Sequence, residues 1–187
     1  MLALRHRLRA VHALAKGGVI AYPTEAVWGL GCDPFNQAAV EKLLALKQRP
    51  RHKGLILVAA DLQQIAPLLV GITPTQRAQL QSTWPGPVTW LMPDPHHWIP
   101  HWVKGDFPTI AVRVSAHPVV RDLCRAWGGP IISTSANRAG EPALRSEWAL
   151  RRHPLLQVDY LIPGTTQKRQ KPSEIRDLQS GRIIRAG

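Results

Sequence analysis

The stretch KQRPRHKGLILVAA (residues 47–60) places a cluster of basic residues directly before a run of six apolar ones. A continuous apolar run of this length is typical of a strand that is buried on both faces of a sheet. Before it, residues 36–47 carry apolar side chains at helical spacing, and Pro50 prevents that helix from continuing. A helix, a basic loop and a buried strand in this order predict a mixed α/β domain with the loop at a strand end.

The rest of the chain alternates helix-like and strand-like segments without a regular repeat. Helical spacing and capping residues predict helices at 4–15, 36–47, after Asp61, 73–84 and 118–127. Apolar runs predict strands at 19–22, 55–60, 88–92, 109–114, 131–134, 160–162 and 182–185, and residues 23–35 are expected to form a loop rich in turns. This irregular order favours an α/β fold of the α+β type, with a mixed sheet and flanking helices, over a Rossmann domain.

Length and composition indicate one globular domain over residues 1–187. The two cysteines are too few for a disulfide framework, and no apolar stretch reaches the roughly 20 residues of a membrane span. Because the basic N-terminus is also unlike a secretory signal, we expect a cytoplasmic protein. The net charge of +12 implies attraction to nucleic acid or to phosphate-bearing substrates, without distinguishing between them.

The familiar nucleotide-binding fingerprints are missing from the sequence. There is no P-loop, and Gly29-Leu30-Gly31 lacks the third glycine and the acidic partner of a dinucleotide site. His96, His97 and His101 have no accompanying acid or cysteine at a standard spacing, so we expect no metal site formed by the protein. A nucleotide would have to be held in another way.

Two polar segments are candidates for that task. Five of the seven residues in 47–53 are Lys, Arg or His, and such side chains bind phosphate oxygens, although a solvated basic turn is the alternative. Residues 133–137 bring three hydroxyls and an amide to the end of an apolar strand. These groups could bind phosphate, ribose or carboxylate, or could only cap a turn.

Three further features are weaker candidates. Thr24 follows the first strand and would reach the edge of a cavity, unless residues 23–25 form a simple turn. Arg113 lies inside an otherwise apolar strand, where a charge needs an ion-pair partner or an anionic ligand. Residues 171–175, followed by Arg185, carry little information by themselves.

Five segments that occur in a fixed order indicate the function more specifically than any one of them does alone. They are PTEAVWGLG (23–31), KQRP (47–50), AVRV (111–114), STSAN (133–137) and Pro172-Ser173. This combination closely resembles the YrdC/TsaC family of L-threonylcarbamoyladenylate synthases from about residue 4 onward, and the chain is similar to the short bacterial form. The resemblance implies a twisted, mostly β-sheet α/β domain with a positively charged concave face.

The resemblance also implies a nucleotidyltransferase that converts L-threonine, bicarbonate and ATP to L-threonylcarbamoyl-AMP and pyrophosphate, with Mg²⁺ accompanying the ATP. The product would serve the formation of threonylcarbamoyladenosine next to the tRNA anticodon. Proteins of a separate transferase complex, which take up the product, would be the partners. Direct binding of tRNA is left open, and no membrane contact is expected.

The resemblance assigns roles residue by residue. Positions that match the family's threonine site are Thr24, Arg113, Ser133 and Ser173. Positions that match its ATP site are Lys47, Arg49, Arg51, Thr109, Ser135, Asn137 and Arg185. Lys47 and Arg49 are expected to be catalytic, because cations stabilise the charge that grows on phosphoryl oxygens. Departures from the family pattern stand at Gly54, Val58, Ala143, Glu174 and Arg176, and they leave the threonine contacts and part of the ATP site less defined.

Two other functions fit part of the sequence. A non-enzymatic module that binds double-stranded RNA or tRNA would explain the +12 charge and the seven scattered tryptophans. A carbamoyl-adenylate enzyme acting on carbamoyl phosphate would share the motifs, but such domains are expected in longer proteins that carry zinc motifs.

Overall fold

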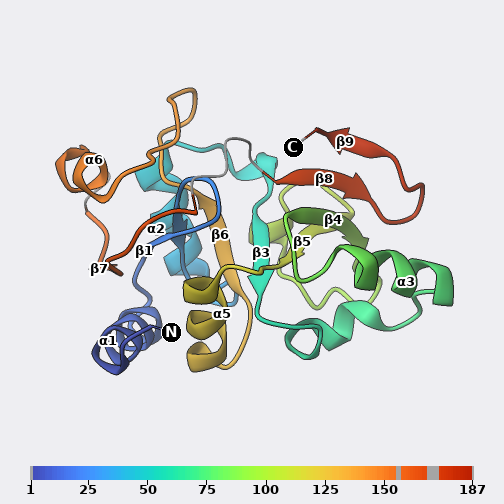
Figure 1. Cartoon of the computed structure of the whole chain (residues 1–187). Helices are drawn as coiled ribbons and strands as arrows, with labels where there is room; N and C mark the ends of the chain where they lie inside the picture. Colours follow the sequence, from blue (N-terminus) through green and yellow to red (C-terminus); the bar gives the residue numbers. More distant parts are fainter. Residues whose placement is uncertain (1, 155–156, 168–172, 187) are drawn as a thin grey trace.

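The computed structural model describes residues 2–154, 157–167 and 173–186 as one α/β unit built on a nine-stranded mixed sheet (Figure 1). The strand order is β7-β1-β2-β6-β3-β5-β4-β8-β9. The strands are β1 (Ile20–Pro23), β2 (Trp28–Gly31), β3 (Ile56–Ala59), β4 (Val88–Pro93), β5 (Thr109–Val114), β6 (Ile131–Ser135), β7 (Tyr160–Leu161), β8 (Glu174–Asp177) and β9 (Ile183–Arg185). The mixed sheet confirms the predicted fold class.

Helices cover both faces of this sheet. The α-helices are α1 (Leu4–Ala15), α2 (Gln37–Lys47), α3 (Pro74–Thr83), α4 (His101–Lys104), α5 (Pro118–Trp127) and α6 (Glu147–Arg152), and short 3₁₀ helices form η1 (Arg51–Lys53) and η2 (Gln63–Leu69). Figure 1 shows α1 and α5 side by side at one edge of the molecule, with β8 and β9 at the opposite side. Every helix in the described ranges is too short or too polar to cross a bilayer.

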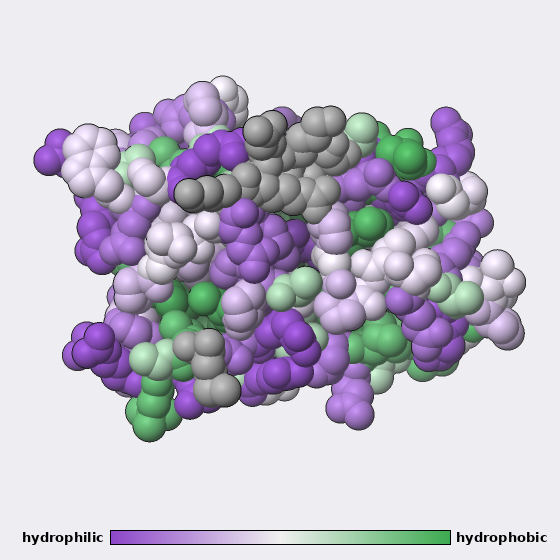
Figure 2. Space-filling model, viewed as in Figure 1, coloured by the Kyte–Doolittle hydropathy of each residue, from purple (hydrophilic) through white to green (hydrophobic). Residues whose placement is uncertain are grey.

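Successive side chains of the central strands point to opposite faces of the sheet, and this explains why two cores form. In β3, Leu57 packs with α2 on one face of the sheet, whereas Val58 packs with α1 and α5 on the other. Both side chains have no exposed surface. An interior strand covered by helices on both faces must be apolar at every position, and this explains the continuous apolar run. Figure 2 shows only small, separate apolar patches on the visible face of the molecule.

The predicted loop at 23–35 was wrong in part, because it contains β2. This strand pairs antiparallel with β1 and with β6. Its sequence Trp-Gly-Leu-Gly hides the strand signal, since glycine is depleted in strands. The structure explains one glycine: a Cβ on Gly31 would lie 2.4 Å from the carbonyl oxygen of Ile132. Close approach of two backbones therefore requires glycine at this position.

Other differences from the sequence prediction are short elements. The segment after Asp61 is the 3₁₀ helix η2 and not an α-helix, since Pro67 lies inside it. Helices α4 and α6 and strand β8 were not predicted, because they have four to six residues and mixed polarity. The remaining predicted helices and strands are confirmed to within about two residues at each end. Lys171 and Pro172 of the predicted motif lie outside the described residues.

We expect Gly31→Ala to lower the free energy of unfolding by about 1–3 kcal/mol, because the added Cβ would meet rigid backbone. Urea denaturation measures this difference. Gly129→Ala is the matched control, since a Cβ there would meet nothing closer than 4.0 Å. Equal stability of the two variants would contradict the close packing of β2 against β6.

Candidate active site

A cleft of about 210 Å³ opens where the turn after β1 meets the ends of several central strands. It brings together seven of the residues predicted for the two substrate sites: Thr24, Arg49, Arg113, Ser133, Ser135, Ser173 and Arg185. Gly29 in β2 lies opposite Ser135 in β6, and a Cβ on Gly29 would lie 3.1 Å from Thr24 Cγ2. Segments more than a hundred residues apart in sequence thus line one cavity.

Arg113 and Glu25 form a buried ion pair in this cleft. The Arg113 Nη1 and Glu25 Oε2 atoms are 3.2 Å apart, and the two side chains are 11% and 10% exposed. The hydroxyl of Ser115 donates to Glu25 Oε1 at 2.7 Å, and the backbone N–H of His117 donates to the same hydroxyl oxygen. Burial acts to raise the pKa of Glu25, but Arg113 and the Ser115 hydroxyl outweigh it, so the pKa lies below its usual value. Arg113 therefore has the partner that its place in an apolar strand demands.

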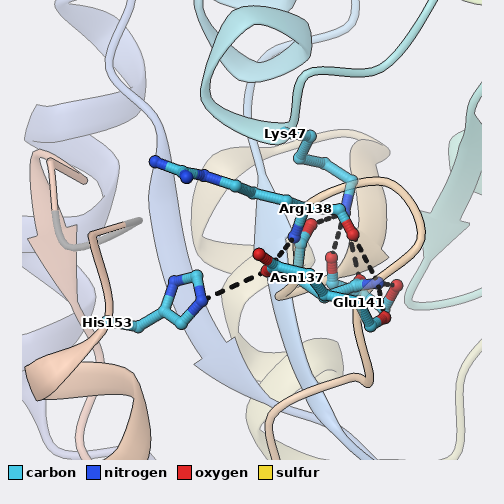
Figure 3. A network of polar contacts seen from close by, with 6 residues as sticks. Lys47, Asn137, Arg138, Glu141 and His153 are labelled. Carbon is cyan, nitrogen blue, oxygen red and sulfur yellow. Dashed lines mark hydrogen bonds and ion pairs between the residues drawn. The ribbon is translucent and has the colours of Figure 1, made fainter.

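Lys47 extends toward Asn137 and the loop that follows β6 (Figure 3). Its ammonium donates to the backbone oxygens of Ser135 and Asn137 and, at 3.3 Å, to Asn137 Oδ1. The side-chain amide of Asn137 donates in turn to the Glu141 carbonyl at 2.7 Å. The far side of the loop is fixed by Glu141, whose Oε2 lies 3.2 Å from His153 Nε2. Lys47 thus holds the Ser135–Asn137 segment in place.

Lys47 loses its proton more readily than an ordinary lysine. Burial, followed by repulsion from Arg49, lowers the pKa of Lys47 to about 8. In the described part of the chain its ammonium contacts only neutral oxygens and has no carboxylate partner. An anionic ligand near this loop would stabilise the charged form.

Two arginines extend from the cleft into a neighbouring one of about 260 Å³. Arg49 Nη2 donates to the carbonyls of Lys53 and Gly54, and Arg185 Nη2 donates to the Ser173 carbonyl. Burial lowers the pKa of both guanidinium groups, and for Arg185 the charge of Arg113 contributes as well. Both remain cations at neutral pH. The neighbouring cleft is mainly apolar and contains Thr109.

Arg51 lies outside both clefts. Its side chain is 74% exposed and pairs with Glu41 Oε1 at 3.2 Å. It lines a separate depression beside Trp102. Lys47 and Asn137 also line neither cleft, but hydrogen bonds join both to Ser135 in the polar cleft, a link that Arg51 lacks among the described residues.

Comparison with known proteins identifies the family of this chain. A family model for Sua5, YciO and YrdC proteins, described as "Telomere recombination", matches residues 12–187. The chain belongs to the Sua5/YciO/YrdC family. It is 54% identical to the threonylcarbamoyl-AMP synthase of Cellvibrio japonicus, over 94% of this chain and 93% of that protein. The corresponding synthase of Marinobacter nauticus is 52% identical, over 90% and 89%.

Solved structures of the Sua5/YciO/YrdC family share the fold. P. abyssi Sua5, determined in complex with L-threonine, superposes with a TM-score of 0.86 at 28% identity. The match covers 96% of this chain and 52% of the Sua5 chain, so this chain spans about half of that longer protein.

Reasoning from sequence missed the role of three residues in this Sua5/YciO/YrdC site. Glu25 stood inside a recognised motif but was not assigned to the site, and Ser115 and His117 were not considered. The signal that could have identified Glu25 was the isolated arginine of β5, which required a carboxylate nearby. Ser115 and His117 are buried polar residues at the start of α5, with 0% and 3% exposure.

The low pKa of Lys47 gives a stability prediction. An unfolded lysine has a pKa near 10.4, so between pH 8 and 10 the unfolded chain binds more protons at Lys47 than the folded chain does. The free energy of unfolding of the wild type should therefore rise relative to Lys47→Met over this range, by about 2 kcal/mol. Urea denaturation at several pH values measures the difference. A difference that does not change with pH would contradict the buried, unpaired ammonium.

Proposed function

We propose that this protein is a threonylcarbamoyl-AMP synthase, a nucleotidyltransferase that uses L-threonine, bicarbonate and ATP. The observation that carries the proposal is the charge of the polar cleft: three arginines and one glutamate line it. Buried Nε atoms of Arg49 and Arg113 have no hydrogen-bond partner among the described residues. A buried N–H group without an acceptor is costly, and anionic substrates would supply the acceptors.

The two clefts suggest how the substrates divide the site. L-threonine would lie in the polar cleft, with its carboxylate on Arg113 and hydroxyls of Thr24, Ser133 and Ser173 around it. ATP would place its phosphates between Arg49 and Arg185, which line both clefts. The apolar cleft next to Thr109 would accept the adenine, because such surfaces suit a flat aromatic ring. Ser135 and Asn137 would bind the nucleotide from the loop that Lys47 fixes.

The reaction needs no nucleophilic side chain. The threonine amine forms a C–N bond with the bicarbonate carbon, and water leaves. A carbamate oxygen then attacks the α-phosphorus of ATP, and the bond to the β-phosphate breaks to release pyrophosphate. Negative charge grows on the phosphoryl oxygens in this step, and preorganised cations stabilise it. Arg49 would contact these oxygens, and Lys47 would act on them through the loop after β6.

We propose that Mg²⁺ enters with ATP and stays mostly bound to phosphate oxygens and water. Glu25 is the single carboxylate in the described lining of the polar cleft, and it is engaged by Arg113 and Ser115. The described residues contain no cluster of three or more His, Cys, Asp or Glu that could hold a metal. Mg²⁺ would neutralise phosphate charge when bound.

We also propose a cytoplasmic location, with the product passed to proteins of a tRNA-modifying transferase complex. Cys32 and Cys124 are both buried and free, as in proteins of reducing compartments. RNA binding without catalysis explains the overall charge but not a buried cleft that contains matched hydroxyls and arginines. That alternative is therefore less favoured.

Pyrophosphate release tests the proposal. We expect release from ATP only when both L-threonine and bicarbonate are present, since the attacking group is made from both. An enzyme-coupled pyrophosphate assay measures it. Equal release with L-serine, or without any amino acid, would contradict the substrate assignment.

Arg49 provides a second test. Arg49→Ala should lower kcat/KM for ATP by about 10²–10³-fold, because it removes a cation from the developing phosphoryl charge. The control is Arg77→Ala, an exposed arginine of α3 that lies away from the clefts. Near-normal turnover of Arg49→Ala, at unchanged thermal stability, would place the phosphates elsewhere.

A further inference from the structure

The ion pair in the polar cleft leaves two buried polar atoms without a partner. Glu25 Oε2 lies 3.2 Å from Arg113 Nη1 but accepts no hydrogen bond from a described residue. Arg113 Nε donates none. Both atoms are buried in residues that line the cleft, and this leaves one acceptor and one donor, on neighbouring side chains of opposite charge, for a ligand to satisfy. An α-amino acid offers the matching pair, an ammonium and a carboxylate.

Glu25 is held so that one oxygen stays available. Its Oε1 atom accepts from the Ser115 hydroxyl at 2.7 Å. Ser115 is fully buried and is fixed by the backbone N–H of His117, which caps α5. The carboxylate is thus anchored through Oε1, while Oε2 has only the ion pair with Arg113.

We propose that Glu25 is the residue that recognises the α-ammonium group of the amino-acid substrate, and that the Glu25–Arg113 pair selects a zwitterion. The inference rests on the proposed function and deepens it by naming which group of the substrate Glu25 binds. Arg49 and Arg185 offer only positive charge, so Glu25 is the single anionic partner for the ammonium in the described lining of this cleft.

The carboxylate of Glu25, which would attract the ammonium, would repel the carbamate that forms from it. Carbamate formation converts the substrate nitrogen from a cationic ammonium to part of an anionic group, with one proton released to water. Glu25 attracts the first and repels the second. The repulsion directs the carbamate oxygens away from Glu25 and toward the arginines Arg49 and Arg185, where the α-phosphate is proposed to lie.

Calorimetric titration with two ligands tests this role. L-threonine carries the ammonium, and 3-hydroxybutyrate has the same carboxylate and β-hydroxyl without it. Glu25→Gln keeps the size of the side chain and an oxygen for Ser115 but removes the charge. We expect it to weaken L-threonine binding by at least tenfold while 3-hydroxybutyrate binds as well as, or better than, it does to the wild type.

The control is Glu41→Gln, which removes a carboxylate that pairs with Arg51 outside the cleft and should change neither affinity. Two results would overturn the proposal. If Glu25→Gln weakens the binding of both ligands equally, Glu25 only positions Arg113. If L-threonine binding is unchanged, Glu25 has no role in recognising the substrate. If the wild type prefers another α-amino acid, the proposed function fails, and that amino acid and its deaminated analogue test Glu25 in the same way. Binding of no amino acid overturns both.

Discussion

The buried ion pair between Arg113 and Glu25 is the constraint on which the site depends. Arg113 lies in β5, inside a sheet with apolar layers on both faces, where an isolated charge would be strongly destabilising. Its partner comes from the turn after β1, nearly ninety residues earlier in the chain. To form the pair, the sheet must bring β1, β2 and β6 beside β3 and β5, and this arrangement is what encloses the cleft.

The second constraint is an excess of positive charge. Arg49 and Arg185 line the same cleft as the pair and have no carboxylate partner among the described residues, and Lys47 is held at the loop after β6 by neutral oxygens. Such a site is organised for anions before they arrive, because hydrogen bonds fix each cation. Lys47 donates to the loop after β6, Arg49 donates to the carbonyls of Lys53 and Gly54, and Arg185 donates to the Ser173 carbonyl just before β8. Part of the net charge of +12 is thereby assigned to a substrate cleft and not to a nucleic-acid surface.

The sequence predicted the parts of the fold whose physical signals are local. Continuous apolar runs identified β3 and β5, and Asn36 correctly marked the start of α2, where its side chain accepts from the Ala39 N–H. The signal failed for β2, because its two glycines resemble a loop, although close backbone contact with β6 requires one of them, Gly31. The burial of Lys47 had no local signal either, because a lysine in a run of basic residues gives no sign that it is 3% exposed. Burial of that kind is decided by strand order, which composition does not reveal.

A structure with L-threonine and a non-hydrolysable ATP analogue bound together tests the central claim most directly. The account predicts the amino-acid carboxylate on Arg113, phosphate oxygens within hydrogen-bond reach of Arg49 and Arg185, and Lys47 still bound to the loop after β6. A nucleotide bound on another surface, such as the basic helix α1, with the Arg113–Glu25 cleft empty, would contradict it.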